Sequence, residues 1–167
     1  QVDYDEYGSK PWAAEPGQSI NYVSCHDNYT VWDKLSASCP EASEETKKAM
    51  NRLCAAIVFT SQGVPFIQAG EEFLRSKPLP DGKGFAENSY NMPDAVNSIK
   101  WDNIHEYPDM IAYYKGLMAL RKAHPVFRMQ SEAEMAQNLC FLSDTPENVV
   151  AYLLRGKGAE NLPENIL

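Results

Sequence analysis

Two short apolar segments that flank one amphipathic helix limit the folds open to this chain. Residues 20–24 and 64–69 are rich in β-branched and aromatic side chains, as strands are. Residues 43–62 between them predict a helix, which Ser43 can cap and Gly63 ends. The expected apolar stripe of this helix is Met50, Leu53, Cys54, Ile57 and Val58. A strand–helix–strand order predicts parallel strands with a right-handed crossover, and the nearly continuous apolar runs predict strands covered on both faces.

The middle of the chain is predicted as a long loop followed by a second helix. Residues 28–40 are expected to form a loop with a short helical turn near 29–35, and residues 74–107 an irregular loop rich in Pro, Gly and Asn. An irregular loop of that length inside a compact domain is usually functional. Residues 108–124 have apolar side chains at helical spacing and end before Pro125, which predicts a helix.

The character of the sequence changes beyond Met129. Residues 138–143 and 149–155 predict two strands joined by a hairpin-like turn. We therefore expect a boundary near residue 128, with α/β material in residues 1–128 and the beginning of an all-β domain in residues 129–167.

Composition excludes several classes of partner and site. The net charge of −8 argues against nucleic acid and anionic membranes, which attract basic surfaces, and is compatible with a neutral substrate such as a sugar. The longest apolar run, residues 54–59, is too short to insert into a bilayer. The four cysteines contain no C-x-x-C pair, which argues against zinc and favours free thiols, with disulfides left open. No signal peptide is visible, and both a cytoplasmic and an exported location stay open.

The first predicted strand ends in three polar residues, His26, Asp27 and Asn28. Barrels of alternating strands and helices present active-site groups at such strand ends. A polar strand end that bonds to nearby backbone is an equally open interpretation. A His-Asp pair also occurs in metal phosphohydrolases, but there it lies on a helix with further ligands. Here the other two histidines lie in a loop and at a helix end, which disfavours a metal hydrolase.

Three segments of the sequence resemble type I pullulanases, debranching enzymes of the α-amylase superfamily (glycoside hydrolase family thirteen). Tyr22-Val23-Ser24-Cys25-His26-Asp27-Asn28, followed by Thr30-Val31-Trp32-Asp33-Lys34-Leu35, is similar to the fourth signature region of that family. Residues 62–73, Gln-Gly-Val-Pro-Phe-Ile-Gln-Ala-Gly-Glu-Glu-Phe, resemble its last barrel strand. Asn88-Ser89-Tyr90-Asn91, Pro93-Asp94 and Asn97 resemble the loop that follows.

The resemblance implies an α/β fold, namely the C-terminal part of a (β/α)8 TIM barrel followed by the first strands of an all-β sandwich. Residues 20–27 and 64–70 would be strands 7 and 8 of the barrel. Residues 43–62 and 108–124 would be the helices that follow them, and residues from about 129 would begin the sandwich.

The resemblance also implies a substrate and a mechanism. The substrate would be an α-glucan such as pullulan, starch or glycogen, cut at α-1,6 branch points with retention of configuration. Retention needs a nucleophilic carboxylate and a carboxylic acid about 5 Å apart. In the family these lie on strands 4 and 5, so we expect both outside this chain and the chain alone to be inactive. Asp27 matches the carboxylate that stabilises the transition state, and His26 matches a residue that binds hydroxyls of the sugar unit at the cleavage point.

Five further residues are predicted to bind substrate, and four others are assigned structural positions. The predicted substrate-binding residues are Asn28, Asp94, Asn97, Trp32 and Tyr90, and each has an open structural interpretation, as packing or as part of a turn. By the same resemblance, Glu71 and Glu72 are expected to be structural. Arg75 and Lys77 are expected on a solvated loop, or paired with Glu71 or Glu72.

Other interpretations remain open at this point. One is another enzyme of the α-amylase superfamily, an isoamylase or a branching enzyme; others are a non-catalytic glucan-binding module or a structural fragment. We expect no cofactor and no metal in the site, with a structural calcium left open. Part of a barrel has an exposed sheet edge, so we also expect association with itself or with the missing part of the barrel.

Overall fold

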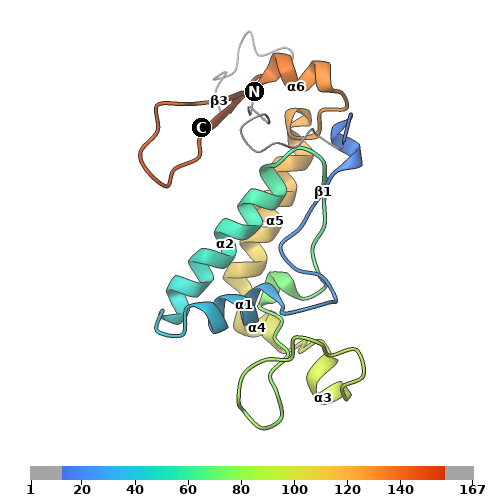
Figure 1. The fold of residues 1–167 in the computed structure, drawn as a ribbon, viewed down its shortest axis with the longest axis vertical. Coiled ribbons are helices and arrows are strands. Elements are labelled where there is room, and N and C mark those ends of the chain that lie inside the picture. Colours follow the sequence, from blue (N-terminus) through green and yellow to red (C-terminus); the bar gives the residue numbers. More distant parts are fainter. Residues whose placement is uncertain (1–12, 157–167) are drawn as a thin grey trace. The chain divides into compact units, whose positions relative to one another are not determined.

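The computed structural model describes residues 13–156 (Figure 1). These residues divide between two compact units. One unit comprises residues 21–60 and 65–119. The other comprises residues 61–64 with the described parts of 1–20 and 120–167. Among the residues described, no helix has the length and apolar character needed to cross a membrane.

The elements follow one another as predicted in outline, with additional short helices. In chain order they are η2 (Pro16–Gln18), β1 (Ile20–Asn21), α1 (Val31–Ser38), α2 (Glu44–Thr60), β2 (Val64–Pro65), η3 (Glu71–Phe73), α3 (Asp94–Asn97), α4 (Asn103–Glu106), α5 (Pro108–Ala123), η4 (Pro125–Arg128), α6 (Glu132–Asn138), β3 (Leu139–Phe141) and β4 (Tyr152–Leu154).

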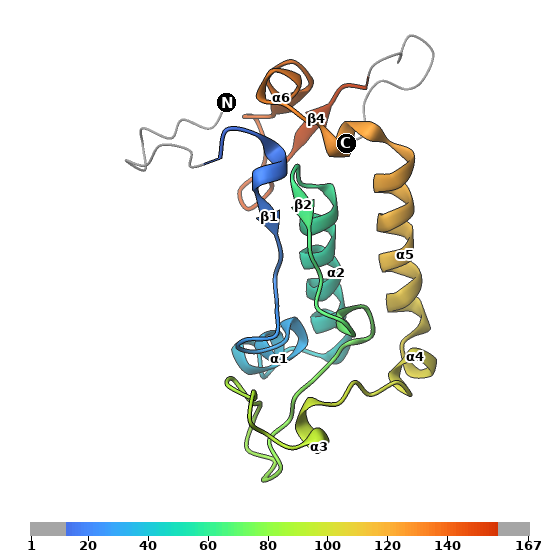
Figure 2. The same ribbon diagram turned by 90° about the vertical axis from the view of Figure 1, so that its right-hand side faces the viewer.

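Strands β1 and β2 pair in parallel, as the sequence predicts (Figure 2). The Val64 N–H donates to the Ser19 carbonyl (2.8 Å), and the Phe66 N–H donates to the Asn21 carbonyl (2.9 Å). Both residue numbers increase by two from one bond to the next, which is the pattern of parallel strands. The two strands joined by α2 therefore form the expected βαβ unit.

The expectation that the strands extend over residues 20–24 and 64–69 and are covered on both faces is wrong for this structure. Each strand has two residues, and Ile20 is 60% exposed while Phe66 is 45% exposed. The rings of Tyr22 and Phe66 meet edge to face, with centroids 6.0 Å apart, and both remain exposed. The apolar residues at 20–24 and 64–69 correctly predict extended backbone at the start of each segment. Within the described residues, however, β1 and β2 have only each other as sheet neighbours, so their faces stay open.

Helix α2 begins and ends close to its predicted limits. The Thr46 N–H donates to the Ser43 hydroxyl (3.1 Å), which confirms the predicted cap, and Gly63 (φ 98°) follows the last turn in the left-handed region. The predicted apolar stripe is partly wrong. Leu53 and Ile57 are 62% and 56% exposed, and the buried face comprises Asn51, Ala55, Val58 and Phe59. Apolar residues occupy two faces of this helix, and packing selects one of them.

The core of the first unit joins α2 to the first half of α5, two helices that lie side by side in Figure 1. Ala55, Phe59, Leu74, Met110 and Tyr114 are buried together, and the rings of Phe59 and Tyr114 meet edge to face at 6.2 Å. The predicted helix over residues 108–124 is thus confirmed, with its apolar stripe against α2. This core supports the loops that follow β1 and β2.

The region predicted as a long irregular loop contains short regular elements. Helices α3 and α4 have four residues each, and Pro78 and Phe85 form an isolated antiparallel bridge. The segment 28–40 likewise contains a full helix, α1, which Thr30 caps by accepting a hydrogen bond from the Asp33 N–H (3.1 Å). Single helical turns show too little periodicity to be recognised in a sequence, which explains why α3 and α4 were not predicted.

The second unit ends in the predicted hairpin. Strands β3 and β4 are antiparallel, with Leu139 opposite Leu154 and Phe141 opposite Tyr152, and both are shorter than predicted. Helix α6 was not predicted, although Ser131 caps it by accepting from the Glu134 N–H, and a Ser-x-x-Glu pattern is a known start signal. Residues 157–167 of the predicted all-β domain lie outside the described part.

Candidate functional site

An open hollow of about 270 Å³ lies where the chain leaves β1 and β2. Two of its side chains follow β1, one follows β2, and the others come from the loop between η3 and the end of α3. The hollow is lined by His26, Asp27, Gln68, Arg75, Lys77, Asn88, Ser89, Tyr90 and Asn97. A parallel βαβ unit brings the ends of both strands to one side, which is why these distant segments meet.

The most exposed polar pair of the hollow is His26 and Asp27. His26 Nε2 lies 3.4 Å from Asp27 Oδ1, and the two side chains are 88% and 66% exposed. An exposed carboxylate beside an imidazole offers both hydrogen-bond acceptors and a donor, the set needed to bind vicinal hydroxyl groups. No group of three or more potential metal ligands occurs among the described residues. The exposed pair can therefore form hydrogen bonds with hydroxyl groups of a ligand.

A buried lysine holds the turn that carries this pair. The Lys77 ammonium donates to the carbonyl of Asn28 (2.9 Å), the hydroxyl of Ser89 (3.1 Å) and, at longer range, the carbonyl of His26 (3.4 Å). Lys77 is only 1% exposed. Asn28 has φ of 60°, in the left-handed region, where asparagine is among the more tolerant residues. The expectation that Lys77 lies on a solvated loop is wrong, because its side chain is buried and bonded to the turn at residues 26–28.

Asp33 anchors the backbone beside that lysine. The carboxylate of Asp33 accepts from the Lys77 N–H (2.8 Å) and from the Ser76 hydroxyl, and its side chain is fully buried. Burial raises the pKa of Asp33, while the hydrogen bonds from Ser76 and Lys77 oppose that rise. Asp33 belongs to α1, so these bonds fasten the loop after η3 to the helix after His26 and Asp27.

A second buried carboxylate, Glu71, accepts a hydrogen bond from the backbone N–H of Gln68 (3.4 Å), a residue that lines the hollow. Its Oε2 accepts from the Ser24 hydroxyl (2.6 Å) and its Oε1 lies 3.4 Å from the Tyr114 hydroxyl, which also donates to Asn51 (2.9 Å). Burial raises the pKa of Glu71. The side chain is buried beside the core and does not line the hollow. This placement agrees with the structural role expected for it.

Arg75 and Asn97 form hydrogen bonds within the segment from the end of β2 to α3. The Arg75 guanidinium donates to the carbonyls of Ala69 (3.1 Å) and Asn97 (2.8 Å), so the expected pairing with Glu71 or Glu72 is wrong. The Asn97 amide donates to the carbonyls of Ser89 (2.6 Å) and Met92 (3.0 Å). These bonds connect the end of β2 to α3 through one continuous set of contacts.

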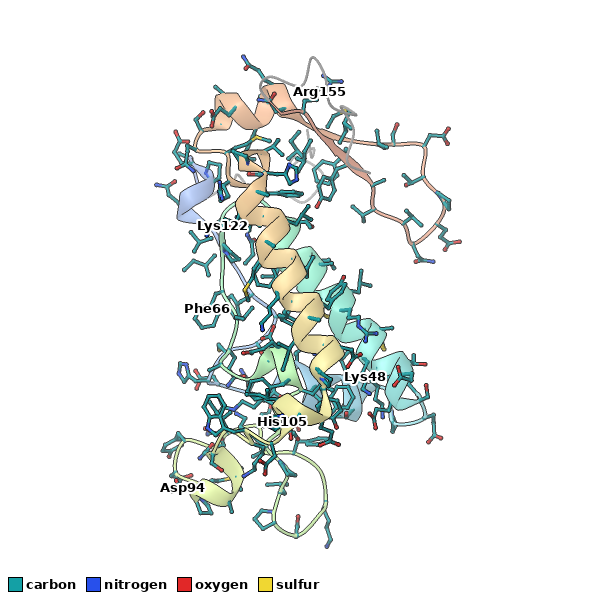
Figure 3. All side chains as sticks on the ribbon, turned by 180° about the vertical axis from the view of Figure 1, so that it is seen from behind. Lys48, Phe66, Asp94, His105, Lys122 and Arg155 are labelled. Carbon is teal, nitrogen blue, oxygen red and sulfur yellow. The ribbon has the colours of Figure 1, made fainter. Side chains whose placement is uncertain are left out.

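Four of the seven predicted site residues meet in the hollow: His26, Asp27, Asn97 and Tyr90, the last 82% exposed. Three do not line it. Trp32 packs against the core of the first unit, Asn28 contributes its carbonyl to Lys77, and Asp94 is exposed at the start of α3 (Figure 3).

The other five lining residues were not predicted as site residues: Gln68, Arg75, Lys77, Asn88 and Ser89. Gln68 was within a segment recognised by resemblance, so its place after a strand could have identified it. No sequence signal identifies Lys77, since its partners lie 12 to 51 positions away and two of them are backbone carbonyls.

The known proteins similar to this chain include pullulanases and an isoamylase. A pullulanase of Bacillus subtilis (strain 168) is 42% identical over 153 residues, which cover 88% of this chain and 20% of that protein. The solved pullulanase of Paenibacillus barengoltzii in complex with maltohexaose and α-cyclodextrin is 47% identical with a TM-score of 0.81, over 90% of this chain and 22% of that one. An isoamylase of Flavobacterium sp. is 30% identical over 175 residues, 90% of this chain and 20% of that protein. No family model matches.

Proposed function

The chain belongs to the pullulanase family, and we propose on that basis that it forms part of a glycoside hydrolase that debranches α-glucans. It spans about a fifth of the length of the Bacillus subtilis relative, so the activity is proposed for a longer protein that contains this chain. The observation that carries the proposal is the exposed pair His26 and Asp27 in the hollow, with the buried Lys77 ammonium bonded to the backbone carbonyls of His26 and Asn28.

The proposed reaction is hydrolysis of α-1,6 linkages with retention of configuration. Such a reaction needs a nucleophile and an acid about 5 Å apart, and we propose that both come from outside this chain. Asp27 then acts as a negative charge beside the sugar ring, where positive charge develops in the transition state. His26, adjacent to it, binds hydroxyls of the same ring. Neither residue replaces the missing pair, so the chain alone is inactive.

The loop side of the hollow is proposed as the binding surface for neighbouring sugar units. Tyr90 is the aromatic residue in the lining, and its exposure leaves its ring free to stack on a sugar face. Asn97 and Asn88 supply amide groups beside it. The solved relative whose complex contains maltohexaose and α-cyclodextrin supports a linear or cyclic α-glucan as the ligand class.

We also propose that β1 and β2 are neighbouring strands 7 and 8 of a (β/α)8 barrel, and that β3 and β4 begin a β-sandwich after a boundary near residue 128. The parallel pairing of β1 and β2 and the exposed side chains of Ile20, Tyr22 and Phe66 support the first part, since a closed barrel would cover them. In the chain alone, those side chains favour self-association. Sedimentation should then show oligomers, and a monomer at all concentrations would contradict this.

An isoamylase activity is the second candidate, favoured by the similarity to the Flavobacterium protein. A substrate comparison with the longer protein distinguishes the two. We expect release of reducing ends from pullulan to exceed release from glycogen, with none from unbranched amylose. Faster cleavage of glycogen than of pullulan would favour an isoamylase. Glucan binding without any hydrolysis would contradict a hydrolase and indicate a binding module. The isolated chain is the negative control.

A further inference from the structure

One buried ammonium joins two separate segments of the hollow. Lys77 Nζ has three donors, and three acceptors surround it: the carbonyls of His26 and Asn28 on one segment and the Ser89 hydroxyl on the other. The two carbonyls flank Asp27 in the sequence. A single side chain therefore fixes the backbone on both sides of Asp27 and ties it to the segment that carries Tyr90.

Burying a charged amine is costly unless it is fully bonded. Desolvation and the nearby Arg75 lower the pKa of Lys77, whereas Asp33 and Asp27 oppose this. Its position is held independently, since its own N–H donates to Asp33 (2.8 Å) and its carbonyl accepts from the Ala86 N–H (2.8 Å). A packed apolar side chain would avoid the desolvation cost but could not bind two carbonyls and a hydroxyl.

We propose that Lys77 is a positioning residue, whose ammonium holds the His26–Asn28 turn and the Asn88–Tyr90 segment in the relative arrangement that the hollow needs. The inference rests on the proposed function for its catalytic consequence, but the positioning itself concerns this chain alone. Lys77 acts through the backbone beside Asp27, so its removal changes where Asp27 lies and leaves the Asp27 carboxylate itself intact.

The hydrogen bonds around Lys77 continue from Ser89 to Asn97 and Arg75, so the loss of this one side chain affects both segments of the hollow. Ser89 accepts from Lys77 through its hydroxyl and from the Asn97 amide through its carbonyl, and Asn97 in turn accepts from Arg75. The turn that presents His26 and Asp27 is thus connected to both sides of the loop. Among the described residues, the hydrogen bonds between the His26–Asn28 turn and that loop are those of the Lys77 ammonium.

Backbone order parameters in the chain itself test the positioning directly. We compare the wild type with Lys77→Met, and with Lys83→Met as the control, because Lys83 is an exposed lysine of the same loop. The expected order parameters at residues 26–28 and 88–90 are near the rigid value of about 0.85 in wild type and control. In Lys77→Met both segments should fall toward about 0.6, while α2 stays unchanged.

Ser89→Ala provides a second variant should Lys77→Met fold poorly. It removes one of three acceptors with little change of volume, so residues 88–90 should become mobile while residues 26–28 stay rigid. Unchanged order parameters at both segments in the variants that fold would overturn the proposal.

A double-mutant cycle in the longer protein tests the consequence for catalysis. Lys77→Met alone should lower kcat on pullulan by at least about tenfold, because charge-assisted hydrogen bonds that fix a catalytic group are lost. In an Asp27→Asn background the same change should have almost no further effect. A full additional loss in that background would indicate a merely structural role and overturn the proposal. Loss of order without any pullulan hydrolysis in the wild type would instead contradict the proposed function and leave the positioning intact.

Discussion

Replacing Asp33 by alanine should be among the most destabilising changes in the first unit. The substitution leaves two donors without their acceptor, the Lys77 N–H and the Ser76 hydroxyl, at a fully buried position. The buried Lys77 N–H left unpaired costs about 1–3 kcal/mol, and the lost bond of the half-buried Ser76 hydroxyl about 1 kcal/mol, so the free energy of unfolding should fall by about 2–4 kcal/mol. Total stabilities are only about 5–15 kcal/mol, and a loss of this size approaches unfolding.

Urea unfolding followed by tryptophan fluorescence measures this loss, because Trp32 packs on the core next to Asp33. Asp33→Asn keeps one acceptor for the Lys77 N–H and can donate to the Ser76 hydroxyl. Its free energy of unfolding should therefore fall by less than that of Asp33→Ala, about 1–2 kcal/mol. Asp102→Ala is the matched control, since that carboxylate is exposed and, although Asp102 is the N-cap residue of α4, its side chain makes no capping hydrogen bond. Asp33→Ala within about 0.5 kcal/mol of this control would refute the anchoring role.

Three other changes test the supports of the hollow and of the second unit. Burial raises the pKa of Glu71, so the folded state keeps this proton to higher pH than the unfolded chain does. The free energy of unfolding should therefore fall as the pH rises above about 4.3. In a pH series of urea melts, Glu71→Gln should remove the part of this pH dependence that Glu71 causes. Gly70→Ala should cost about 1–2 kcal/mol, because φ is 92° and a Cβ would lie 3.1 Å from Arg75 Cβ; a thermal melt unchanged from wild type would contradict this. Arg121→Met should lower the free energy of unfolding by about 1–3 kcal/mol, because the Arg121 guanidinium donates to two carbonyls of the turn after α2 (2.6 and 2.7 Å). Lys122→Met, at an exposed neighbouring position, should leave the free energy of unfolding unchanged in the same urea melt.

The elements with strong local signals could be predicted from the sequence. Helix α2 has a capping serine and a terminating glycine, and α5 has an apolar stripe and a following proline, so both were found within two residues. The hairpin β3–β4 was found because two strand-like runs flank a turn. Local signals do not say which apolar face is buried, which is why Leu53 and Ile57 were wrongly assigned to the core.

The site could be predicted in part. His26 and Asp27 were found because polar residues directly follow an apolar run, and Tyr90 and Asn97 because their loop resembles a known family. Lys77 and Asp33 were missed as structural supports because their roles depend on backbone groups of distant segments. A backbone carbonyl leaves no trace in the sequence, so such contacts become visible only once the chain is folded.

The rate of pullulan hydrolysis by Asp27→Asn in the longer protein tests the proposed role of this chain most directly. The exchange keeps the shape of the side chain and removes the negative charge proposed to stabilise the transition state. Asp81→Asn, at an exposed loop position, is the control. We expect kcat/KM to fall by about 10²-fold or more in Asp27→Asn with an unchanged melting temperature, and to stay at the wild-type value in the control. Hydrolysis by Asp27→Asn within about twofold of the wild type would contradict a catalytic role for this carboxylate.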